Sequence, residues 1–178
     1  TTDTKLLGGL QHLVADDPTA SATIGGINQA TYSFWRNNTS GDIDLSTSAL
    51  VFAAMNSMWL NCVRGTDKPD CIPTDSSLYI LYEASLQAQQ RFADSDTAAA
   101  GFESIKYKTA DVVYDDQCPT GHMYFLNTDY LYLRPHVDRQ FVPLSERDSI
   151  NQDAMVQPVV WAGNLTTSNR SLQGVIYT

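Results

Sequence analysis

The sequence predicts an α+β fold in which a mostly antiparallel sheet is flanked by two main helices. Two stretches between residues 44 and 92 repeat apolar residues at helical spacing. From residue 101 onward the chain changes to short β-branched and aromatic runs that are separated by turn residues. Because both helices precede the strands, we expect two layers, with the helices packed on the sheet.

Residues 1–43 are predicted to be a lead-in segment with little regular structure. The segment is rich in Gly, Ser, Thr, Asn and Asp, and its DDPTAS and IGGINQ stretches are typical of turns and loops. Its aromatic residues Tyr32, Phe34 and Trp35 form more apolar surface than an exposed loop usually carries. We therefore expect this aromatic cluster to pack against another surface.

The first predicted helix lies in DLSTSALVFAAMNSMWLNCVRG, residues 44–65. Asp44, Ser46 or Ser48 can cap its start, and Gly65 is placed where a left-handed residue often ends a helix. Its apolar residues at helical spacing are Val51, Ala54, Met55, Met58 and Cys62.

The second predicted helix lies in PTDSSLYILYEASLQAQQRF, where Thr74 or Asp75 can serve as the cap. Its apolar stripe consists of Leu78, Leu81, Tyr82 and Leu86. Between the helices, DKPDCIP predicts a buried extended segment that leads into the second helix.

Four strands are predicted from FESIKYK, DVVYDD, HMYFLN and DYLYLRP, and the last two are expected to be adjacent strands joined at Thr128 and Asp129. In HMYFLN, Tyr124 and Leu126 should face one side of the sheet, and Met123 and Phe125 the other. The tail contains two further extended runs, DAMVQPVVWAGN and SLQGVIYT. We therefore divide the chain into a lead-in (1–43), a core of helices and strands (44–150) and C-terminal strands (151–178).

Composition narrows the possible functions. The chain has 178 residues, 43% of them hydrophobic, which is enough for a substantial core. Its 20 acidic and 11 basic residues give a formal charge of −9 without any basic cluster, which argues against sequence-specific nucleic-acid binding. The longest apolar run, ALVFAAM, is too short to span a membrane. Three cysteines do not suggest a disulfide framework, and we expect reduced thiols in a cytosolic setting.

Cys118 and His122 are the candidate metal ligands, because their i, i+4 spacing suits one face of a helix. Further ligands would come from Cys62, Cys71 and Asp115. However, Pro119 and Gly121 between the two residues favour a turn. We favour a buried cysteine followed by a histidine that opens a strand, and keep a small metal-binding or enzymatic module as the alternative.

No catalytic or cofactor-binding residue is predicted. Cys118 follows Asp115 and Asp116, whose negative charge disfavours a thiolate nucleophile. The sequence contains no Gly-x-Ser-x-Gly turn and no glycine-rich phosphate loop. Neighbouring carboxylates such as Asp16 and Asp17 point to opposite faces of an extended chain, so they are not expected to act as an acid/base pair.

A series of blocks in order resembles the major capsid proteins of tailed bacteriophages and prophages. The blocks are GGLQHLV, GGINQATYSFWRNN, AAMNSMWLNCVRGTDKPDCIPT, YEASLQAQQRFAD, AGFESIKYKTADVVYDDQCPTGHMYFLNTDYLYLRPH, FVPL and NQDAMVQPVVWAGNLTTSNRSLQGVI. The resemblance implies that 44–150 is the axial domain, that 1–43 belongs to the peripheral domain or a linker, and that 151–178 returns to the peripheral domain. It also implies a longer protein with roughly a hundred further residues upstream.

The resemblance implies a structural role without catalysis or cofactor. The partners it implies are other copies of the chain in capsomer hexamers and pentamers, with scaffold and portal proteins as further candidates. The expected location is the virion capsid, and the bacterial cytoplasm during assembly. A cellular nanocompartment shell protein is an alternative within the same class, and a ligand-binding module of an acidic extracellular protein is an alternative outside it.

Overall fold

The computed structural model describes residues 7–44, 46–87, 104–148, 150 and 153–178, and its centre is a six-stranded sheet. From one edge to the other, the strands are β3 (Asn38–Ser40), β14 (Gly174–Tyr177), β7 (His122–Phe125), β4 (Cys71–Thr74), β6 (Ala110–Tyr114) and β5 (Ser104–Tyr107). The β3–β14 and β4–β6 pairs are parallel, and the other three are antiparallel. The predicted α+β class is confirmed, and the sheet draws strands from all three predicted segments.

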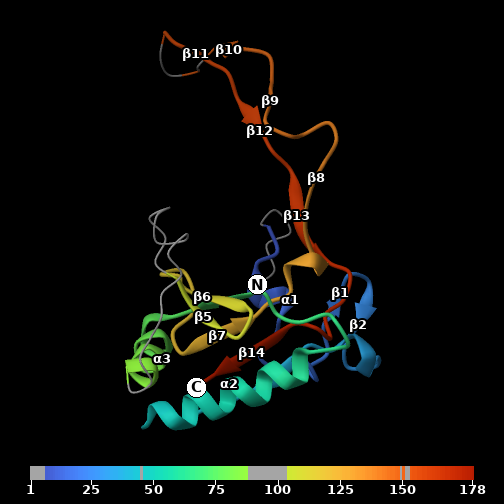
Figure 1. The fold of residues 1–178 in the computed structure, drawn as a ribbon. Helices are drawn as coiled ribbons and strands as arrows, with labels where there is room; N and C mark the ends of the chain where they lie inside the picture. Colours follow the sequence, from blue (N-terminus) through green and yellow to red (C-terminus); the bar gives the residue numbers. More distant parts are fainter. Residues whose placement is uncertain (1–6, 45, 88–103, 149, 151–152) are drawn as a thin grey trace.

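Two helices cover one face of this sheet (Figure 1), and both were predicted. They are α2 (Ser48–Cys62) and α3 (Ser76–Gln87). Helix α2 lies very close to β14 at Gly174, where an added Cβ atom would be 2.6 Å from the sulfur of Cys62 and 2.6 Å from that of Met58. Glycine at this position therefore sets how closely helix and sheet can approach. None of the described helices is long and apolar enough to span a bilayer.

The predicted helix ends are partly wrong. The N-cap of α2 is Thr47, whose side chain makes no capping hydrogen bond, while Asp44 accepts one from the Ser46 amide further upstream (2.8 Å). The helix ends at Cys62, and Gly65 adopts a left-handed φ of 59° in the turn that follows. For α3, the predicted cap at Asp75 is confirmed, because Asp75 Oδ1 accepts a hydrogen bond from the amide of Leu78 (3.1 Å) at the start of the helix.

The two faces of β7 are as predicted. Met123 and Phe125 pack into the cluster formed with α2 and α3, whereas Tyr124 and Leu126 belong to the cluster on the opposite face. That second face is covered by the lead-in segment of the same chain through Leu13, Val14 and Ile24.

The prediction that HMYFLN and DYLYLRP form adjacent strands is wrong. Both edges of β7 are already paired, one with β14 and the other with β4. After β7, Asn127 caps a short 3-10 turn, η2 (Thr128–Tyr130), by accepting from the amide of Asp129 (3.2 Å). The turn directs β8 (Leu131–Pro135) out of the sheet, where it pairs with β13 (Gly163–Thr167).

The lead-in segment contains more regular structure than predicted. Its elements are α1 (Leu10–Leu13), β1 (Thr23–Ile24), β2 (Ile27–Asn28), η1 (Ser33–Trp35) and the sheet strand β3. Trp35 donates its indole N–H to the carbonyl of Ile24 (2.9 Å), as expected of a packed aromatic residue. Tyr32 and Phe34 contact each other but are 50% and 67% exposed, so among the described residues the expected packing is found for Trp35 alone.

Candidate functional site

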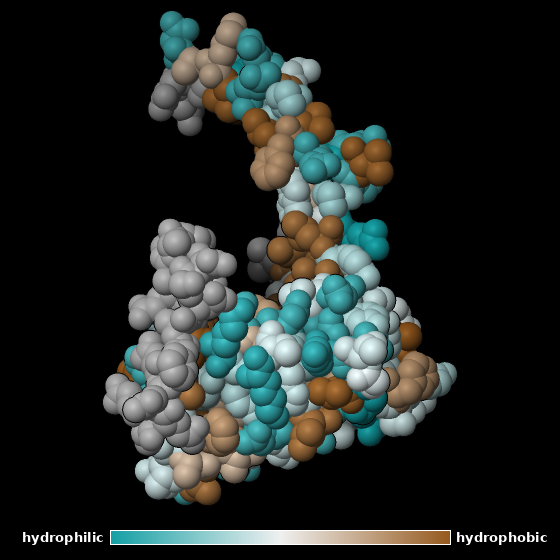
Figure 2. Space-filling view, viewed as in Figure 1, coloured by the Kyte–Doolittle hydropathy of each residue, from teal (hydrophilic) through white to brown (hydrophobic). Residues whose placement is uncertain are grey.

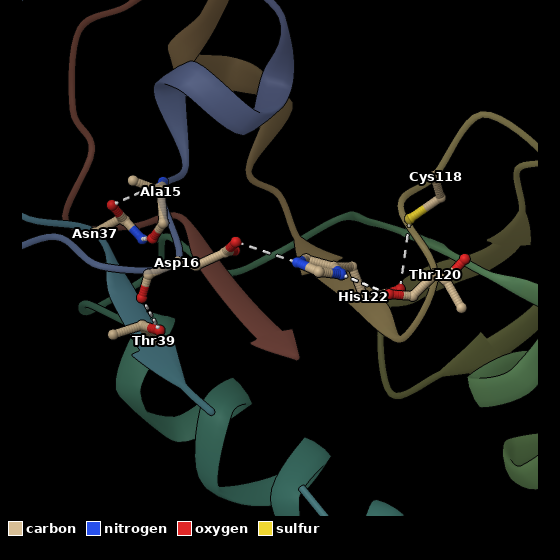
Figure 3. A network of polar contacts seen from close by, with 7 residues as sticks. All are labelled: Ala15, Asp16, Asn37, Thr39, Cys118, Thr120 and His122. Carbon is tan, nitrogen blue, oxygen red and sulfur yellow. Dashed lines mark hydrogen bonds and ion pairs between the residues drawn. The ribbon is translucent and has the colours of Figure 1, made fainter. Parts of the chain in front are cut away.

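Cys118 lies in the turn before β7, and His122 is the first residue of β7, as the preferred interpretation of the sequence predicted (Figure 3). The His122 Nε2 atom lies 3.2 Å from the Asp16 carboxylate, and its Nδ1 atom lies 2.9 Å from the carbonyl oxygen of Thr120. The ring stacks between Tyr124 and Tyr177, at centroid distances of 6.1 and 5.8 Å. Both ring nitrogens are therefore engaged within the chain.

The polar network around Asp16 joins the lead-in segment to the sheet (Figure 3). Thr39 in β3 donates its hydroxyl to the backbone carbonyl of Asp16 (2.8 Å). Next to it, Asn37 exchanges two hydrogen bonds with the backbone of Ala15, at 2.8 and 3.2 Å. Each contact joins segments that are far apart in sequence, which is the expected role of a structural network.

The Cys118 thiol donates to the carbonyl of His122 (3.4 Å). Burial, with smaller contributions from Asp75 and Asp115, raises the pKa of this thiol to about 11. Burial also raises the pKa of Cys62 to about 12, and it raises that of Cys71. These conditions disfavour thiolate chemistry at neutral pH.

The candidate metal ligands do not converge. Cys62 packs in the cluster beneath the helices, while Cys71 and Cys118 adjoin the cluster on the other face. In the described part of the chain, no group of three His, Cys, Asp or Glu side chains is arranged to hold a metal ion.

A feature that sequence reasoning missed is a long β arm, residues 131–167, that projects from the sheet (Figure 1). The β8–β13 ladder forms its base. Two shorter antiparallel pairs continue it, β9 (Val142–Pro143) with β12 (Val159–Val160) and β10 (Arg147–Asp148) with β11 (Met155–Val156). The arm is two strands wide along its length, and such a ribbon is marginally stable when nothing packs on it.

Large apolar side chains line this arm without cover from the chain itself. Figure 2 shows hydrophobic residues along the arm, interspersed with hydrophilic ones. The exposed large apolar residues are Tyr132, Leu133, Val137, Phe141, Val142, Ile150, Met155, Val156 and Val159. Val137 is 92% exposed and Met155 is 72% exposed. Exposed apolar surface of this extent marks an interaction site. We therefore take the arm as the candidate functional site.

Comparison with known proteins identifies the fold alone. The sequence matches no protein-family profile and no curated protein. By structure, the chain is similar to a chain of the cyanophage A-1(L) capsid asymmetric unit, with a TM-score of 0.63 and 20% sequence identity. This chain has the fold of a phage capsid subunit. The match covers 96% of this chain and 58% of the cyanophage chain, so the chain spans little more than half of that subunit.

Proposed function

We propose that this chain is part of the major capsid subunit of a tailed bacteriophage or prophage, and that its role is structural. The observation that carries the proposal is the exposed apolar arm on a capsid fold. A protein that works alone gains nothing from such a surface, whereas a shell subunit must contact several neighbours through different faces.

The proposal extends to partners and location. Copies of the subunit would associate into hexamers and pentamers that enclose DNA, with scaffold and portal proteins as further partners. The subunit would be in the host cytoplasm during assembly and in the virion capsid afterwards. The core of residues 44–150 would be the axial domain, flanked by the 1–43 and 151–178 segments, which would belong to the periphery. This role requires no catalytic residue or cofactor.

Removing the arm tests the proposal. The Pro135–Gly163 pair closes the β8–β13 ladder, so residues 136–162 can be replaced by an Asn-Gly turn without changing that register. In the 178-residue chain we expect the melting temperature of the core to change by less than about 3 °C, because the arm contributes little to either buried cluster.

In the longer protein that contains this chain, the same deletion should abolish assembly. Electron microscopy and light scattering would show rings or shells for the intact protein and only small species for the deletion variant. Shells that form equally well without the arm would contradict its assigned role. An intact longer protein that stays monomeric under all assembly conditions would contradict the capsid proposal itself.

A further inference from the structure

A pocket of about 260 Å³ opens on the sheet face opposite α2 and α3. Its apolar walls come from Leu10 in α1, Pro73 in β4 and Pro119 in the turn before β7. Tyr124 and Asp115 supply polar groups to the same pocket. The volume suits one long side chain rather than a large ligand.

Tyr124 carries the first sign of a ligand. The residue is 2% exposed, and its hydroxyl is buried with no hydrogen-bond partner among the described residues. A buried polar group left unpaired destabilises the folded chain. Tyr124 packs in a cluster with the apolar residues Val14 and Leu126, so phenylalanine would satisfy the packing here equally well. A group that entered the pocket would supply the missing partner.

The charge around the pocket selects for a cation. One oxygen of the Asp115 carboxylate accepts from the Gln117 amide (2.9 Å), and the other has no partner in the described part of the chain. Among the described residues, no basic side chain lines the pocket. Burial raises the pKa of Tyr124, and the nearby Asp16 carboxylate raises it further. An anionic ligand would be repelled from this site, and a guanidinium or ammonium group would be attracted.

The chain itself carries a suitable cation on the arm. Arg36, Arg64 and Arg170 donate to carbonyl oxygens, and Arg134 lies over the Tyr132 ring, so these side chains are engaged. Two arginines on the arm, Arg139 and Arg147, are exposed, and the described residues offer neither side chain a hydrogen bond or an ion pair. Arg147 lies between Glu146 and Asp148, whose charges offset its own, so Arg139 is the better candidate.

The backbone of Arg139 is nevertheless fixed in place. Its amide donates to His136 (3.1 Å), and its carbonyl accepts from Ala162 (2.9 Å). Val137 and Phe141, on either side of it, are 92% and 70% exposed. The turn thus presents one cation between two apolar side chains.

The five residues of β8 alone carry the arm roughly 16 Å away from the sheet. Arg139 therefore cannot reach the pocket of its own chain. We propose that the pocket lined by Tyr124 binds the Arg139 side chain of a second copy of this chain. This contact would join neighbouring subunits of the proposed capsid, so the inference rests on the proposed function. The guanidinium donates to the Tyr124 hydroxyl and the Asp115 carboxylate, while its methylene groups pack on Leu10 and Pro119.

The contact is head to tail, because each copy offers an arm to one neighbour and a pocket to another. Such a contact can be tested by mixing variants of the 178-residue chain. Sedimentation velocity at rising concentration should show progressive association for the wild type. The Asp115→Asn and Arg139→Gln variants should each associate at least about tenfold more weakly, as expected for a lost charge-assisted hydrogen bond.

An equimolar mixture of these two variants should form 1:1 dimers and nothing larger. The Asp115→Asn copy has an intact arm, and the Arg139→Gln copy has an intact pocket. The arm of the first copy binds the pocket of the second, and neither copy can then bind a third one. Mixtures that remain monomeric, or that associate as far as the wild type, would overturn the inference.

Two further variants separate binding from folding. Tyr124→Phe should weaken association about three- to tenfold, since it removes a hydroxyl with no partner among the described residues. The same change should not lower the melting temperature of the unassociated chain, because no hydrogen bond within it is lost. Asp116→Asn removes the same charge from a residue that does not line the pocket and should change association less than about twofold. Equal effects of Asp115→Asn and Asp116→Asn would refute the contact. If the longer protein still forms shells with Asp115→Asn, the inference fails while the capsid proposal stands.

Discussion

Arg170 provides the sharpest test of how the fold is held together. Its side chain is 0% exposed and donates only to neutral oxygens of the lead-in segment. Nε donates to the Leu13 carbonyl (2.6 Å), and Nη1 donates to the Gln29 side chain (3.0 Å) and the Trp35 carbonyl (3.1 Å). Nη2 donates to Asn37 Oδ1 (2.8 Å). The Arg170 side chain thus holds four residues between positions 13 and 37 by hydrogen bonds.

Replacing Arg170 with methionine removes these four donors while filling much of the same volume. Burial lowers the pKa of Arg170 to about 10, so the guanidinium is still charged at neutral pH and the lost donors are charged ones. The cost of desolvating the buried charge offsets part of these charged hydrogen bonds, so we take a net value of about 1 kcal/mol for each. Arg170→Met should then lower the free energy of unfolding by about 4 kcal/mol. For a chain of this size, the melting temperature should fall by about 8–16 °C.

Urea denaturation followed by circular dichroism measures this change. The matched control is Arg64→Met, because Arg64 is exposed and donates only to Asn61 and Val63 in its own turn. We expect less than about 1 kcal/mol for the control. Amide exchange should rise first in residues 13–37 for the Arg170 variant. A loss below about 1 kcal/mol for Arg170→Met, or one equal to the control, would refute this account of the fold.

Two other predictions concern the helix-bearing face and the thiols. Gly174→Ala should destabilise the chain by about 1–3 kcal/mol, because the added Cβ would overlap the Cys62 sulfur. The control is Gly9→Ala, where no atom lies within 4 Å of the added Cβ, and it should change stability by less than about 0.5 kcal/mol. Similar denaturation midpoints for the two variants would contradict this prediction. With its pKa at about 11, Cys118 should react with iodoacetamide at pH 8 about 200-fold more slowly than an ordinary thiol. Raising the pH forms thiolate, so the rate should increase about tenfold per pH unit up to pH 10, and a plateau below pH 9 would contradict the raised pKa.

Local elements could be predicted from the sequence because their pattern is set by burial within the same chain. Helices α2 and α3 show the 3.6-residue period, and Asp75 lies three residues before Leu78, whose amide it caps. The alternation of Met123 and Tyr124 between two faces follows from the strand period alone. These features need no knowledge of distant partners.

Pairing between distant segments could not be predicted in this way. DYLYLRP has the composition of a sheet strand, but β7 had no free edge for it, and its partner β13 begins at Gly163. Arg170 lies in the polar run SNRSL, and nothing local distinguishes a buried guanidinium from a solvated one. Cys118 and His122 drew attention through their spacing, but the turn between them directs both toward backbone carbonyls.

The arm shows the limit of hydrophobic patterning most directly. An apolar run indicates that a surface becomes covered, but it does not indicate which molecule covers it. Phe141 and Met155 are of residue types that are usually buried in a core, yet they are 70% and 72% exposed. The cost of ordering a two-stranded ribbon is normally offset by burial, which this chain alone does not supply to the arm. In the proposed capsid, contacts with neighbouring subunits would supply this burial and would couple the ordering of the arm to assembly.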